Sequence, residues 1–123
     1  MRAVFVELPP FARYRDRYLD DDALRVLQEL LMQAPQLGAL IQGTGGLRKL
    51  RIGNARRSKG KRGGLRVIYF HWSAGPEFWL YTLYEKGEVD DLTPAQKADL
   101  RVLLKAELLA RRIHEGEEKK SLQ

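Results

Sequence analysis

The sequence predicts an α+β domain with the element order β-α-α-β-β-β-α and a mostly antiparallel sheet. Two patterns support this fold class. Apolar residues recur at helical spacing near both ends of the chain, and the middle alternates glycine-rich turns with short runs of β-branched and aromatic residues. The 123 residues suffice for one domain with a real core and are too few for two. We expect a compact domain over residues 1–110.

The first third of the chain is expected to form a strand and then a helical hairpin. Residues 3–8 predict a short strand that stops at Pro9-Pro10. A brief amphipathic helix follows, predicted by the helical spacing of three aromatic residues, Phe11, Tyr14 and Tyr18. A second helix starts at the acidic segment Asp20–Asp22, where an N-cap and first-turn acids belong, and runs to Pro35. Its apolar positions are Leu24, Leu27, Leu30, Leu31 and Ala34.

The middle of the chain is expected to form an antiparallel meander. Segments 47–52, 65–72 and 78–84 predict three consecutive strands, because each is rich in residues that favour strands and turn residues separate them. Between the first two lies a polar, strongly basic loop over residues 53–64.

The last element is expected to be a helix with a marked start. Thr93-Pro94-Ala95-Gln96 supplies an N-cap threonine, a proline at the first helical position and a glutamine three residues after the cap. Leucines supply its apolar face. From Arg111 onward the sequence turns polar, so we expect residues 111–123 to form a charged, frayed tail.

The charge of the chain is concentrated in its centre. Residues 30–76 contain no aspartate or glutamate but nine basic residues: Arg48, Lys49, Arg51, Arg56, Arg57, Lys59, Lys61, Arg62 and Arg66. The chain has 22 basic and 16 acidic residues, so the rest of it sums to 13 minus 16, or −3. A positive field focused in this way attracts a polyanion and speeds the encounter with it.

Side chains that commonly perform catalysis are scarce. The chain has no cysteine, which excludes disulfides, thiol catalysis and cysteine-bound zinc and fits a reducing cytoplasm. His71 lies in an apolar strand, where a hydrogen-bonded structural histidine is the commoner case, and His114 lies in the charged tail. The acidic clusters, Asp20–Asp22 and Asp90–Asp91, each precede a helix, which explains them better than magnesium binding does. The glycine-rich segment 43–46 precedes a strand and lacks the ending of a phosphate loop. We expect no metal, no cofactor, no nucleotide hydrolysis and no membrane span.

Lysine, arginine and tyrosine remain as the candidates for chemistry. Lys49 and Arg51 share one face of their strand by period two, as do Tyr84 and Lys86 at the end of the third. Arg66 follows a Gly-Gly pair at the start of an apolar strand, where the pleat would hold it rigidly for positioning a phosphate. RNA can be cut without metal when its own 2′-hydroxyl attacks the adjacent phosphate, which requires a base, cations and an acid. Lysine and tyrosine can serve as base and acid, since neighbouring arginines lower the pKa of a lysine.

Three segments carry a family resemblance. They are Gly45-Gly-Leu-Arg-Lys-Leu-Arg51, Gly60-Lys-Arg-Gly-Gly-Leu-Arg-Val-Ile-Tyr69, and Tyr81-Thr-Leu-Tyr-Glu-Lys86 followed by Asp91-Leu-Thr93. Together they resemble the RelE/HigB toxins, and the HigB branch most closely. The similarity extends from about Val4 to Leu104, with the same element order. A RelE-like fold is therefore expected.

The resemblance implies a ribosome-dependent mRNA endonuclease, the toxin of a type II toxin–antitoxin pair, which cleaves the message in the ribosomal A site. Arg66 falls on the family's characteristic strand arginine and would stabilise the charge of the phosphorane. Lys61 or Lys86 would transfer protons, and Tyr84 would stack on a base or assist as acid. The residues expected to hold RNA are Lys49, Arg51, Arg56, Arg57, Lys59 and Arg62. Which group is the base and which the acid stays open.

The resemblance also implies a cognate helix-turn-helix antitoxin, through which alone the protein would contact operator DNA. Two other readings stay open. A ParE-like toxin of the same fold would inhibit DNA gyrase without cutting RNA, and a plain RNA-binding module would hold phosphates without chemistry. The dense cations between residues 59 and 66 argue against a gyrase inhibitor, which has no need of them.

Overall fold

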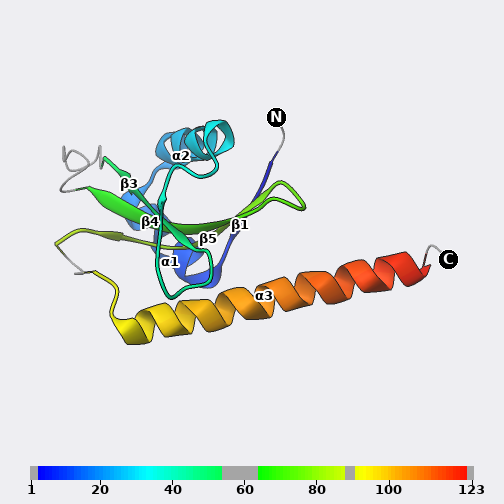
Figure 1. Cartoon of the computed structure of the whole chain (residues 1–123). Helices are drawn as coiled ribbons and strands as arrows, with labels where there is room; N and C mark the ends of the chain where they lie inside the picture. The colour runs from blue at the N-terminus through cyan, green and yellow to red at the C-terminus, as the bar shows by residue number, and fades with distance from the viewer. Residues whose placement is uncertain (1–2, 54–63, 88–90, 122–123) are drawn as a thin grey trace. The chain divides into compact units, whose positions relative to one another are not determined.

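The computed structural model describes residues 3–53, 64–87 and 91–121. They form an α+β arrangement in the order β1-α1-α2-β2-β3-β4-β5-α3 (Figure 1). The chain divides into two compact units. The first, formed from two segments up to Asp91, holds the sheet with α1 and α2, and the second holds α3 together with residues 42–45. The predicted α+β class is confirmed, with one short strand added to the expected order.

The N-terminal elements match the predicted strand and helices. They are β1 (Val4–Glu7), α1 (Pro9–Tyr18) and α2 (Asp21–Gln33). Helix α1 begins at the proline pair itself, because proline lacks an N–H and its fixed φ suits the first helical turn. Asp20 is the N-cap of α2 as predicted, and its Oδ1 accepts a hydrogen bond from the Ala23 N–H at 2.8 Å.

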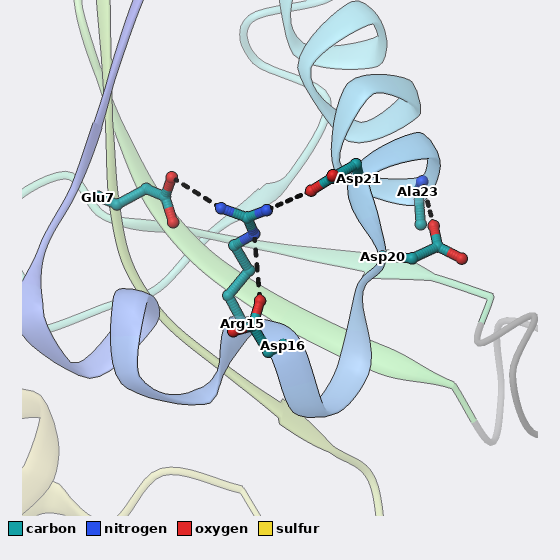
Figure 2. A network of polar contacts seen from close by, with 6 residues as sticks. All are labelled: Glu7, Arg15, Asp16, Asp20, Asp21 and Ala23. Atoms are coloured by element: carbon teal, nitrogen blue, oxygen red, sulfur yellow. Dashed lines mark hydrogen bonds and ion pairs between the residues drawn. The ribbon is translucent and has the colours of Figure 1, made fainter.

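Arg15 connects β1, α1 and the start of α2 (Figure 2). Its Nη2 donates to Asp21 Oδ1 at 2.6 Å, and its Nη1 lies 3.7 Å from Glu7 Oε2. A third contact, 4.0 Å long, joins Arg15 Nε to Asp16 of the same helix. The Asp21 side chain is largely exposed, and pairs of this kind contribute about 0–1 kcal/mol each. The network therefore restrains the turn between the helices more than it stabilises the fold.

The sheet has the order β1-β5-β4-β3-β2. Strands β3 (Arg48–Ile52), β4 (Leu65–Trp72) and β5 (Glu77–Glu85) pair antiparallel, which confirms the predicted meander. Strand β1 pairs with β5 in parallel. The additional strand, β2 (Ala39–Leu40), pairs with the start of β3. Two residues are too few to show an alternating pattern, so the sequence did not reveal it.

The core of the first unit lies between the sheet and helices α1 and α2. Tyr69 is part of this core, and its hydroxyl makes two hydrogen bonds. The hydroxyl donates to the Pro35 carbonyl at 2.9 Å and accepts from the Gly38 N–H at 3.0 Å. This pair of hydrogen bonds ties the segment after α2 to β4. The buried residues of the cluster are Phe11, Tyr18, Leu19, Leu24, Leu27, Leu31, Leu50, Leu65, Val67, Tyr69, Phe78, Leu80 and Leu83.

Helix α3 (Pro94–Ser121) opens on the predicted capping box. The Gln96 N–H donates to Thr93 Oγ1 at 3.1 Å, and Gln96 Oε1 accepts from the Thr93 N–H at 2.9 Å. The helix runs on to Ser121, beyond the point where we expected the tail to begin. Charged residues are good helix formers, and Arg111 pairs with Glu107 one turn earlier at 3.2 Å. Fraying of the tail stays a prediction. No helix in the described ranges has the length and apolar character to cross a membrane.

Candidate functional site

The register of the sheet sorts the strand residues onto two faces, because successive side chains point to opposite sides. One row across β3, β4 and β5 belongs to the core beside α1 and α2: Leu50, Val67 and Leu83. The adjacent row therefore lies on the other face: Arg51, Arg66 and Tyr84. Lys49 has the same parity as Arg51. We call these four residues, Lys49, Arg51, Arg66 and Tyr84, the cationic face. All four were predicted as site residues.

Arg66 is fixed within this face. It is 4% exposed, and its Nη1 lies 3.3 Å from the Leu65 carbonyl oxygen and 3.5 Å from that of Gly64. Arg51 is its direct partner across the ladder and is exposed. Two guanidinium groups on one face of adjacent strands favour an anion between or beside them. A phosphate that contacts Arg66 must approach through its small exposed fraction or displace neighbouring side chains.

Tyr84 brings a buried hydroxyl into the same row. The residue is 9% exposed, and its hydroxyl makes no hydrogen bond with any residue that the structure describes. Burial raises the pKa of Tyr84; the charge of Asp91 raises it further, and Arg66 lowers it. The hydroxyl is therefore neutral near pH 7. A protonated phenol without a partner, beside cations, is suited to donating a proton or a hydrogen bond to a ligand.

Lys49 pairs with Asp91, a residue that was not predicted to belong to the site. Its Nζ lies 2.8 Å from Asp91 Oδ1, with 21% of the Lys49 side chain and 84% of the Asp91 side chain exposed. From the sequence, Asp91 was expected to stabilise the start of the last helix through its negative charge. However, Thr93 caps α3, and Asp91 reaches back to β3 instead. The two residues are 42 positions apart, and no local pattern could have joined them.

Lys86 continues the ladder beyond Tyr84. Its N–H donates to the Gly64 carbonyl at 3.1 Å, and its side chain is exposed. By parity it belongs to the same side of β5 as Tyr84. The five predicted loop cations lie outside the described residues, so their assignments stay predictions: Arg56, Arg57, Lys59, Lys61 and Arg62.

Two other candidates on β3 and β4 have local packing partners. Arg48 donates from Nη1 to the carbonyl oxygens of Gly38 at 2.7 Å and Gln36 at 3.3 Å, which holds the segment before β2. His71 stacks on Phe78 with ring centroids 4.9 Å apart. Burial lowers the pKa of His71, and the charge of Arg48 lowers it further, so the ring is neutral near pH 7. Neither residue belongs to the cationic face.

The molecule also has an apolar groove of about 790 Å³ between α2 and β3. Its walls include Val26, Leu27, Leu30, Leu50 and Ile52. Lys49 and Arg51 of the cationic face also line this groove, at its β3 edge. Because phosphate recognition needs fixed cations rather than an apolar lining, we place the candidate chemistry on the cationic face.

Among the described residues, no group of three or more histidine, cysteine, aspartate or glutamate side chains is arranged to hold a metal ion. No protein-family model matches the chain. The site is therefore interpreted from its own geometry. It brings together cations for a phosphate, a neutral phenol and one carboxylate held by a lysine.

Proposed function

We propose that the protein is a ribosome-dependent mRNA endonuclease, the toxin of a type II toxin–antitoxin system. The observation that carries this proposal is the row of Arg51, Arg66 and Tyr84 across three strands, with Lys49 beside it. The row lies in the segments that resemble the RelE/HigB toxins. It combines a buried cation, an exposed cation and a protonated hydroxyl, which are groups that metal-free phosphoryl transfer can use.

In the proposed reaction the RNA supplies its own nucleophile. The 2′-oxygen attacks the adjacent phosphorus, the bond from phosphorus to the 5′-oxygen breaks, and the products are a 2′,3′-cyclic phosphate and a 5′-hydroxyl. Arg66 and Arg51 stabilise the charge that develops on the phosphorane oxygens. Tyr84 donates its proton to the departing 5′-oxygen, as its neutral state allows.

The proposal includes the partners that the resemblance implies. The substrate is mRNA in the ribosomal A site, and the exposed cations, together with the basic residues of segment 53–64, hold it electrostatically. A helix-turn-helix antitoxin neutralises the protein and carries it to operator DNA. The proposed reaction uses no cofactor and takes place in the cytoplasm.

The first prediction concerns Arg66→Ala. We expect the purified variant to cleave mRNA on programmed ribosomes about 10²–10³-fold more slowly than the parent, because it lacks a preorganised cation at the phosphorane. Primer extension measures the cut, and a thermal melt checks that the variant folds. Arg25→Ala, on the surface of α2, is the control and should cleave at the parent rate.

Several outcomes contradict the proposal. If the Arg66 variant cuts at the parent rate, the role of Arg66 is wrong. If the parent itself leaves ribosome-bound mRNA intact, the endonuclease function is wrong. Loss of DNA supercoiling with intact mRNA would then indicate a gyrase inhibitor. Salt-dependent RNA binding without products would indicate a binding module.

A further inference from the structure

The cationic face contains more acids than bases for the reaction proposed above. Arginine cannot lose its proton in a protein, so Arg51 and Arg66 accept nothing. Tyr84 is neutral and donates. The Lys49 ammonium is engaged in an ion pair, in which its Nζ donates to a carboxylate. None of these described groups is ready to take the proton of a 2′-hydroxyl.

We infer that Asp91 is the general base of this site and that Lys49 is the positioning residue that holds it. The inference rests on the proposed function. Its geometric basis is the 2.8 Å contact between Lys49 Nζ and Asp91 Oδ1, which brings a carboxylate to a face otherwise formed by cations and a phenol. A carboxylate has two oxygens and about four lone-pair sites, so the ion pair at Oδ1 does not exhaust its capacity to accept.

The charge of the Asp91 carboxylate also acts on the proposed acid. The charge of Asp91 acts on the Tyr84 hydroxyl, and Arg66 acts on the same hydroxyl with the opposite sign. Asp91 is 84% exposed in its side chain, so substrate can reach it without rearrangement of the core. Base and acid then differ in environment: an exposed carboxylate paired with a lysine, and a buried phenol.

The proton balance is complete without another reactant. The 2′-hydroxyl gives its proton to the Asp91 carboxylate as the bond from the 2′-oxygen to phosphorus forms. The bond from phosphorus to the 5′-oxygen breaks, and that oxygen takes the proton of Tyr84. Solvent afterwards removes the proton from Asp91 and restores the one on Tyr84.

A rival role for the same contact gives the opposite result. If Asp91 only occupied Lys49 as an internal anion that RNA must displace, its neutralisation would speed cleavage. As the base, its neutralisation slows the chemical step while RNA binding stays equal or tightens, since a negative charge has been removed from the face. The two roles therefore predict different changes in the cleavage rate, which can be compared with the change in RNA affinity.

The test compares Asp91→Asn with the parent in single-turnover cleavage on programmed ribosomes, at the cut position mapped with the parent. We expect a loss of about 10²–10⁴-fold in rate with no loss of RNA affinity, and partial recovery in Asp91→Glu. Asp22→Asn is the matched control, because Asp22 is also an exposed carboxylate paired with a cation. It should cleave at the parent rate.

A second substrate separates base from acid. In an mRNA whose 5′-bridging oxygen at the cut is sulfur, the leaving thiolate needs no proton, because thiols are far stronger acids than alcohols. Asp91→Asn should stay slow on this substrate. Recovery there would show that Asp91 acts on the leaving group and would overturn the inference, as would cleavage by Asp91→Asn at or above the parent rate. In each case the parent still cuts, so the proposed function survives.

Discussion

At the scale of single residues, the cationic face places groups where the fold alone would not favour them. Arg51 and Arg66 are direct partners across β3 and β4, and like charges directly opposite each other destabilise a sheet. Tyr84 buries a hydroxyl that finds no hydrogen-bond partner among the described residues, which costs about 1–3 kcal/mol. The like-charge pair and the unpaired hydroxyl are both unfavourable for stability, and both lie in one row of the sheet. A ligand that supplies negative charge and acceptor oxygens relieves both.

Tyr84→Phe separates catalysis from stability in this row. We expect single-turnover cleavage to fall about 10²–10⁴-fold, because the proton donor is lost. The free energy of unfolding should stay equal or rise by about 1 kcal/mol, because a buried hydroxyl without a partner is removed. On the substrate with a bridging sulfur, cleavage should return close to the parent rate. Denaturant titration and primer extension measure the two effects.

The pH dependence of unfolding gives an independent check on Tyr84. Because burial raises its pKa in the folded state, the stability linked to its neutral form is fully present below pH 10.0, the ordinary pKa of tyrosine. That stability is lost as pH rises through the folded pKa. Tyr84→Phe should therefore weaken the decline of the unfolding free energy above pH 10.0. An unchanged decline would mean that Tyr84 is not buried as described.

At the scale of elements, local patterns predicted most of the fold. Period-two runs and turns gave β3, β4 and β5, and caps gave the starts of α2 and α3, because these signals involve residues a few positions apart. The patterns did not reveal β2, which is only two residues long. They also could not place β1 beside β5, since parallel pairing leaves no turn signal between its strands.

In the segment between α2 and β3, the backbone at Gly38 passes close to Tyr69 and to the backbone of Lys49. A Cβ at Gly38 would lie 2.9 Å from Tyr69 Cε1 and 3.0 Å from the backbone carbonyl of Lys49. Both neighbours are held in place, one by two hydrogen bonds and the other by the β2–β3 ladder. We expect Gly38→Ala to destabilise the protein by about 1–3 kcal/mol in urea titration. Ala39→Ser, at the next and exposed position, should have no comparable effect. Equal stability of parent and Gly38→Ala would show that β2 moves freely.

At the scale of the whole molecule, the sequence predicted the cations better than the carboxylate that accompanies them. The alternation of side chains along β3 and the position of Arg66 in β4 could be predicted from the sequence. The antiparallel register then places Arg51 and Arg66 in one row. Asp91 was not readable as part of the site, because its partner on β3 is 42 positions away. The acid-free window thus contains three of the four residues of the cationic face, and tertiary structure adds the carboxylate of Asp91.

The distribution of charge predicts how RNA binding responds to salt. The sequence assigns Arg56 and Arg57 to RNA binding and not to chemistry, and both lie in the acid-free window. If each neutralises one phosphate of a single strand, the double variant Arg56→Ala/Arg57→Ala should lower the slope of log affinity against log salt by about 1.4. Fluorescence anisotropy with a short single-stranded RNA measures this slope. At saturating RNA, single-turnover cleavage should keep the parent rate.

The control for that slope is Arg13→Ala/Arg25→Ala, which removes the same charge from outside the window. It should leave the slope close to that of the parent, because a cation contributes to counterion release only where it contacts phosphate. An equal fall in both double variants would mean that net charge, rather than the central window, drives binding. The central window would then not be the RNA-binding segment. The role of the row of Arg51, Arg66 and Tyr84 is tested separately, by the cleavage assays.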